Sequence, residues 1–185
     1  MEILIPMRRA TLRRYFTGIA AVFLAVTGMS AQAAQSLEYD VKAAFLYKFA
    51  AYVEWPAAVF PTPQSPITLC VAGADPFGPN LDNLVQNQRI GERPILLRRI
   101  PAVAKGSGCQ ILYLGNSSQS TVDALAATHG EPILTVTDNA PTAGIVNFVL
   151  QNDSVRFQID DKAASESGLS ISSRLLSVAT SVKPR

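Results

Sequence analysis

Ile67-Thr68-Leu69-Cys70-Val71-Ala72-Gly73 decides the fold class, because it is a nearly continuous apolar run that ends in glycine. A strand without polar alternation is covered on both faces, as in a parallel sheet with helices on either side. Asp75-Pro76-Phe77-Gly78 then supplies a turn, and Pro79 suits the first position of a short helix. The stretch therefore predicts the first strand–turn–helix step of an α/β domain.

Upstream of this strand, a helix is predicted from Ser36 to Trp55, because apolar residues recur there at helical spacing. It ends before Pro56, since proline cannot continue the helical hydrogen-bond ladder. The predicted apolar face comprises Val41, Phe45, Phe49, Tyr52 and Val53, and the other side carries Lys42, Lys48 and Glu54.

Downstream, strands are predicted at 94–100, where Arg98-Arg99 reaches solvent, at 109–115 and at 133–137, with a helix before the last of them that Ser117 or Ser118 caps. Residues 145–150 and 155–160 read as an antiparallel hairpin, because apolar and polar residues alternate in the second strand. Two helical pieces follow, at 161–167 and 172–182, separated by Gly168. This order predicts a single layered α/β domain with a mixed, mostly parallel sheet flanked by helices and one antiparallel hairpin.

The N-terminus carries the pattern of a secretory signal peptide. Four arginines between positions 8 and 14 precede a short apolar run from Phe16 to Val26, and Ala31-Gln32-Ala33 matches a signal-peptidase site. We therefore expect residues 1–33 to be removed near Ala33, and residues 34–185 to form a periplasmic domain. The pair Arg13-Arg14 leaves export by the twin-arginine route open.

The charge of the mature chain limits the classes of partner, and its two cysteines indicate a disulfide. Without residues 1–33, 12 of the 16 basic and 13 of the 14 acidic residues remain, a formal charge of −1. This balance predicts no nucleic acid or anionic membrane as partner. Export favours a disulfide between Cys70 and Cys109, worth roughly 4 kcal/mol by the chain-entropy estimate, and two separately buried thiols are the alternative.

Catalytic machinery is not evident in the sequence, and we expect no enzyme, cofactor or metal site. The single histidine, His129, precedes Gly130 at a predicted helix end, and no nucleophile motif accompanies it. Asp160-Asp161 is read as a helix cap rather than a calcium ligand. The turn containing Asp75, Phe77 and Gly78 lies where α/β folds bind ligands, so it is a candidate small-ligand site.

Several segments, in order, carry a family resemblance: Val41–Phe49 running into Val53–Pro56, then Leu69–Val71 with Asp75–Gly78, Cys109, and Gly168–Leu176. Together they resemble the YfiR family of periplasmic proteins. The resemblance implies a homodimeric α/β protein that binds the periplasmic sensor region of a YfiN-type inner-membrane diguanylate cyclase. Release of the cyclase would raise cyclic di-GMP and favour biofilm formation. Relatives are also associated with redox sensing through two disulfides, of which Cys70 and Cys109 match one pair.

A repressor of this kind needs an exposed apolar patch that binds one state of its partner better than the other. The bend around Gly168 is predicted to provide it, through Glu166, Leu169, Ile171 and Arg174. The alternative function is a periplasmic protein that binds a small ligand or peptidoglycan fragment and serves another membrane sensor. A hydrolase built on His129 is the third hypothesis.

Overall fold

The apolar run at 67–72 forms β2 (Ile67–Ala72), an interior strand of an eight-stranded sheet in a computed structural model that describes residues 35–115 and 118–185. All six of its residues are buried, because the sheet has a layer on each face. β2 pairs in parallel with β4 (Arg93–Ile100) on one side and with β5 (Ile111–Leu114) on the other. The predicted buried strand is therefore confirmed.

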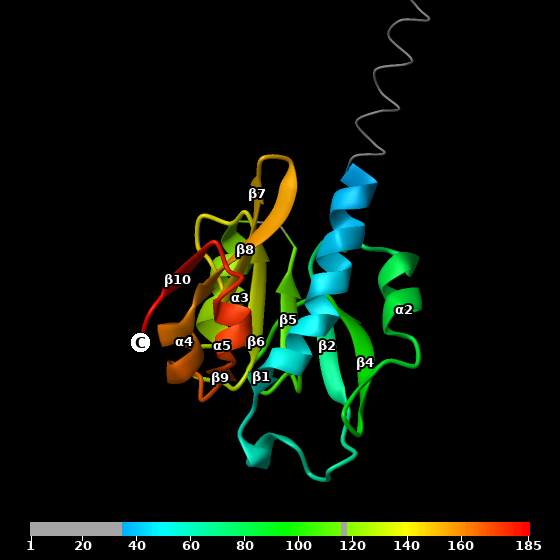
Figure 1. Cartoon of the computed structure of the whole chain (residues 1–185). Coiled ribbons are helices and arrows are strands. Elements are labelled where there is room, and N and C mark those ends of the chain that lie inside the picture. The colour runs from blue at the N-terminus through cyan, green and yellow to red at the C-terminus, as the bar shows by residue number, and fades with distance from the viewer. Residues whose placement is uncertain (1–34, 116–117) are drawn as a thin grey trace, which may run out of the picture. The chain divides into compact units, whose positions relative to one another are not determined.

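The rest of the sheet extends from these strands in the order β10-β8-β7-β6-β5-β2-β4-β3 (Figure 1). β6 (Leu134–Asp138) pairs in parallel with β5 and with β7 (Val146–Gln151). β7 and β8 (Ser154–Asp160) form the predicted antiparallel hairpin, whose turn residues Asn152 and Asp153 both have positive φ. Short β3 (Arg89–Ile90) is antiparallel to β4 at one edge. The predicted mixed, mostly parallel sheet is confirmed.

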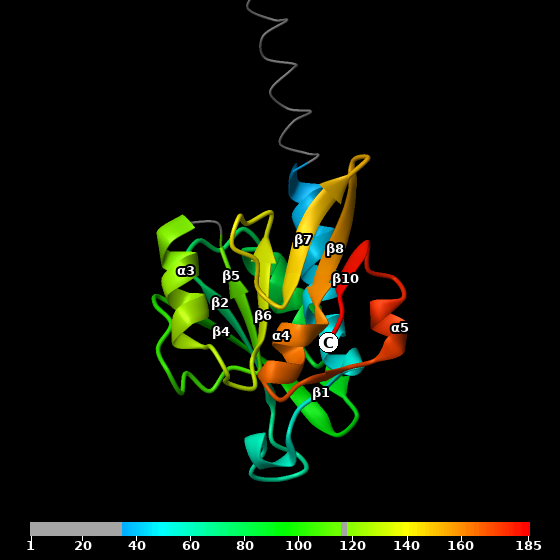
Figure 2. The ribbon, with the colours of Figure 1, turned by 90° about the vertical axis from the view of Figure 1, so that its left-hand side faces the viewer.

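Helices lie on both faces of the sheet, as Figures 1 and 2 show. Residues 38–48 of the N-terminal helix, which the structure describes from residue 35 to 48, pack on one face together with α2 (Pro79–Val85). α3 (Ser118–Ala127) packs on the other face, over a smaller cluster that contains the disulfide between Cys70 and Cys109. The predicted disulfide is confirmed. The predicted capping by Ser117 or Ser118 falls outside the described residues and side chains.

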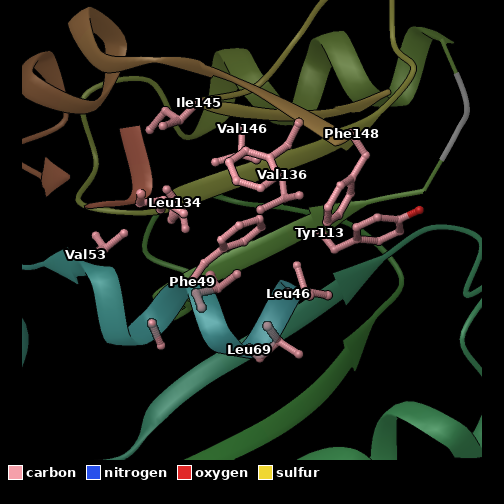
Figure 3. Packing of buried hydrophobic residues seen from close by; sticks show 14 of the residues in the cluster. Leu46, Phe49, Val53, Leu69, Tyr113, Leu134, Val136, Ile145, Val146 and Phe148 are labelled. Carbon is pink, nitrogen blue, oxygen red and sulfur yellow. The ribbon is translucent and has the colours of Figure 1, made fainter. Parts of the chain in front are cut away.

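Aromatic side chains hold the N-terminal helix against the sheet. The ring of Phe49 lies 5.8 Å from that of Phe148 and 5.2 Å from that of Phe157, between ring centroids. Leu46 packs in the same cluster against the sheet residues Leu69 and Tyr113 (Figure 3). This larger core fixes one side of the helix to the sheet.

The orientation of the N-terminal helix differs from the prediction. Lys42 is 2% exposed, whereas Val41 and Tyr52 lie at the surface. The cause is electrostatic: the Nζ of Lys42 lies 2.6 Å from Oδ1 of Asp138 at the end of β6, and it also pairs with Glu38. The helix is therefore rotated so that one lysine points inward and part of the predicted apolar face points outward.

The two ends of the domain also depart from the predicted helices. The N-terminal helix stops at residue 48 and continues as a 3₁₀ turn, η1 (Phe49–Tyr52), and a short strand, β1 (Val53–Glu54). The predicted helix at 172–182 is reduced to α5 (Ser173–Leu176), after which β10 (Ser181–Lys183) pairs in parallel with β8. In both places the chain pairs with a distant strand, and those hydrogen bonds replace helical ones.

Candidate partner-binding site

The segment from Asp160 to Ser177 contains the residues that were predicted to contact a partner. α4 (Asp161–Glu166) begins at Asp160, whose carboxylate accepts a hydrogen bond from the amide of Ala163 at 2.8 Å. It ends at Gly168, where φ is +72° and the amide of Leu169 donates to the carbonyl of Ala164. The glycine turns the chain back toward the body of the domain.

Leu169 and Ile171 do not form an exposed patch, so that part of the prediction is wrong. Their side chains are 3% and 5% exposed and belong to the larger core cluster. The reason is backbone pairing: β9 (Ser170–Ile171) is antiparallel to β1, with Ile171 opposite Val53, and the amide of Ser172 donates to the carbonyl of Tyr52. These bonds aim both side chains inward.

Glu166 and Arg174, the charged members of the predicted patch, are exposed. The carboxylate of Glu166 lies 3.9 Å from the Nζ of Lys162 on the same helix. Arg174 lies in the first turn of α5, which Ser172 caps through a hydrogen bond from the amide of Leu175. The buried leucine and isoleucine therefore act as anchors that place two charged side chains at the surface.

Arg174 borders a groove of about 460 Å³ between α5 and the N-terminal helix. Its wall and floor are mostly aromatic and aliphatic, and comprise Phe45, Lys48, Phe49, Tyr52, Phe157, Arg174, Leu175, Ser177 and Val178. No sequence signal marked this groove, because its residues come from three segments that are distant in the chain. Tyr52 and Val178, which border it, are 39% and 61% exposed.

The buried ion pair beneath the N-terminal helix fixes which side of the helix faces the sheet. Burial alone lowers the pKa of Lys42, but hydrogen bonds to Asp138 and Glu38 outweigh it and raise the pKa above its ordinary value. The hydroxyl of Tyr113 also donates to Asp138, at 3.2 Å, and burial raises the pKa of Tyr113. Lys42 therefore stays charged, and the helix is locked in register with β6.

The polar groups of the turn at 75–78 are bonded to other groups of the domain. The carboxylate of Asp75 accepts a hydrogen bond from the amide of Phe77 at 2.8 Å and pairs with Arg99 at 2.6 Å. Phe77 is buried, with its ring 4.7 Å from that of Tyr113, and the carbonyl of Gly78 accepts from Arg99. Ligand binding by Asp75, Phe77 and Gly78 stays a prediction, and in this structure their groups serve the fold.

Two other hollows border α3. A cleft of about 240 Å³ opens at the carboxyl ends of β2 and β5, where Gly73 and Gly115 face Thr121. This is the position where the strand order reverses, the usual ligand site of such sheets. His129, which is exposed, borders a second hollow of about 300 Å³ with Val122 and Thr142. Within the described ranges, no three His, Cys, Asp or Glu side chains gather in a metal-binding group.

The fold and its surfaces define a class: an α/β domain with an apolar groove edged by charged side chains, a feature typical of binding surfaces. The chain belongs to the YfiR/HmsC-like family, whose model matches residues 39–180. Membership indicates a regulatory role in diguanylate cyclase signalling rather than a catalytic one, a periplasmic location and a membrane-associated signalling partner. No curated protein matches the chain. In the part of the chain that is described, no helix is long and apolar enough to cross a membrane.

Proposed function

We propose that the mature protein is a periplasmic negative regulator that binds the sensor region of an inner-membrane diguanylate cyclase and so restrains cyclic di-GMP production and biofilm formation. The family match over residues 39–180 carries this proposal. The predicted signal peptide, residues 1–33, would deliver the domain to the periplasm, where it would act as a homodimer.

The partner contact is proposed to include Glu166 and Arg174. Both are exposed, and the buried residues Leu169 and Ile171 lie between them in the chain and fix the backbone that carries them. Charged side chains that are already positioned lose less conformational freedom on binding. Leu169 and Ile171 support this contact from within the core rather than touching the partner.

Affinity capture from cross-linked bacterial envelopes tests the proposal. The tagged mature protein should recover a membrane diguanylate cyclase, and a Glu166→Lys/Arg174→Glu variant should recover much less of it. Lys105→Glu, an exposed charge reversal in the loop before Cys109, is the matched control and should behave like the wild type. Deletion of the gene should raise cellular cyclic di-GMP. Recovery of cell-wall fragments without any membrane sensor would contradict the proposal.

A second candidate function, small-ligand binding in service of a membrane sensor, rests on the cleft at the ends of β2 and β5. The cleft lies at the switch point of the sheet, where such folds bind ligands. Soluble peptidoglycan fragments added to the purified mature protein should then raise its melting temperature. A Thr121→Phe variant, which fills the cleft, should lose that shift.

A further inference from the structure

The outer side of the N-terminal helix, continued by η1, carries a stripe of partly exposed side chains. Val41, Phe45 and Lys48 follow one another at intervals of four and three residues, which places them on one helical face, and Tyr52 in η1 borders the same hollow as Phe45 and Lys48. Val41 and Tyr52 are 36% and 39% exposed, and Lys48 is exposed as well. Apolar side chains concentrated on one open face are typical of contact surfaces.

The stripe lies under two neighbouring hollows, which together are here called the groove. The lower part of the groove is the hollow of about 460 Å³ beside α5, and its upper part is a hollow of about 370 Å³ that Asp40, Val41 and Ala44 border. Phe45 and Lys48 border both parts, so the two lie side by side along the helix. The helical rise gives the groove a length of about 18 Å, enough for roughly three turns of a second helix.

The floor of this groove is rigid. The ring of Phe45 lies 5.5 Å from that of Phe157 and 6.1 Å from that of Phe49, between centroids. Leu175, which borders the lower part, is 5% exposed. A preformed apolar floor binds without the cost of rearranging its own side chains.

Unpaired positive charge marks the lower part of the groove. Among the described residues, neither Lys48 nor Arg174 makes an ion pair, whereas Lys42, Arg99 and Lys183 each pair with a carboxylate. No acidic side chain lines the lower part. The carboxylate of Asp40, in the upper part, accepts a hydrogen bond from Asn80 at 2.6 Å. The groove is therefore apolar along its length and cationic at one end.

We propose that this groove docks an acidic amphipathic helix of a protein partner. Its apolar side chains would lie on Phe45, Tyr52 and Val178, and its carboxylates would face Lys48 and Arg174. Helix-in-groove recognition needs such an apolar floor with charges at its rim. An anionic membrane fits less well, because two cations are fewer than membrane-binding clusters contain and the mature chain carries a formal charge of −1. The inference rests on the proposed function, since the helix would belong to the sensor region of the cyclase.

Synthetic helical peptides of about 14 residues, which span about 21 Å, test the groove directly. One peptide carries a leucine face and glutamates, a second carries the same leucine face and lysines, and a third carries glutamates without leucines. By fluorescence anisotropy, the mature protein should bind the first at least about tenfold more tightly than the other two. Salt should weaken that binding.

Charge reversal then locates the binding site. Lys48→Glu/Arg174→Glu should weaken binding of the acidic peptide by about tenfold and improve binding of the basic one. Val178→Asp should also weaken binding of the acidic peptide. Lys105 and Arg156 are exposed outside the groove, so Lys105→Glu and Arg156→Glu should leave that binding unchanged. Equal binding of all peptides, no binding, or tighter binding to phosphatidylglycerol vesicles would overturn the inference.

Envelope capture separates this inference from the proposed function. If Lys48→Glu recovers the cyclase as well as wild type does, the regulatory function stands and the groove is not its docking site. If the peptides bind as expected and no cyclase is captured, the groove stands as a helix-binding site and the regulatory function fails.

Discussion

The bend at 168–171 and the stripe on the N-terminal helix border the same core, yet their apolar side chains face opposite ways. In the bend, Leu169 and Ile171 point inward because β9 is hydrogen-bonded to β1. On the helix, Val41 faces solvent because the ion pair between Lys42 and Asp138 turns another side toward the sheet. The difference teaches that contacts made by a whole element, rather than the character of one side chain, set its exposure.

The largest effect is expected from a charge placed in the bend. Leu169→Asp should destabilise the domain by about 4 kcal/mol or more, because it buries an unpaired carboxylate in the core. That is a large share of the roughly 5–15 kcal/mol that hold a domain together, so the thermal transition should shift far down or vanish. Val178→Asp, at a residue that is 61% exposed, should change unfolding free energy by less than about 0.5 kcal/mol. Similar melting temperatures for both variants would refute the comparison.

A somewhat smaller loss is expected beneath the helix. Asp138→Ala removes the main partner of Lys42 and the acceptor of the Tyr113 hydroxyl, leaving a buried ammonium with Glu38 alone. Breaking a buried pair on one side costs about 3 kcal/mol, which urea unfolding would measure. Asp123→Ala, an exposed carboxylate on α3, is the control. If both lower the unfolding free energy equally, the pair does not hold the helix in register.

The conformation of the bend should depend on its glycine. Gly168→Ala should lower the unfolding free energy by about 1–2 kcal/mol, because φ is +72° and an added Cβ would lie 3.4 Å from Cγ of Pro56. Ser165→Ala, in α4 just before it, should be neutral or slightly stabilising, since alanine favours helix. A neutral Gly168→Ala would mean that the turn tolerates another backbone conformation.

The smallest effect concerns the decrease in stability at low pH. Burial alone raises the pKa of Asp160, but hydrogen bonds from Lys183 and the amide of Ala163 outweigh it and hold the pKa below its ordinary value. A depressed folded-state pKa contributes stability above the unfolded value of about 3.9, and that contribution disappears as pH falls through the folded pKa. Asp160→Asn should therefore reduce the loss of stability below about pH 4, seen in thermal melts across pH. If stability decreases at low pH as much in Asp160→Asn as in the wild type, the ion pair between Asp160 and Lys183 contributes nothing measurable.

Much of the fold follows from the sequence alone. Apolar runs without alternation predict β2, β5 and β6, since such runs are stable as strands only when both faces are covered. Alternation and a short polar turn predict the β7–β8 hairpin, and export chemistry predicts the bond between Cys70 and Cys109. In the candidate site, the exposure of Glu166 and Arg174 agrees with the sequence prediction, their contact with a partner stays a prediction, and the groove was not predicted.

The sequence by itself determined the layered α/β class, the main buried strands with the hairpin, and the family. Only the tertiary structure decided where the N-terminal helix ends, that residues 181–183 form a strand, and which side of the helix meets water. Each of these depends on a partner distant in the chain: Ile171 for Val53, β8 for β10, and Asp138 for Lys42. Local propensity acts over a few residues, whereas backbone pairing and ion pairing act wherever folding brings two segments together. The end of the helix, the strand at 181–183 and the exposed side of the helix are therefore settled only in the folded chain.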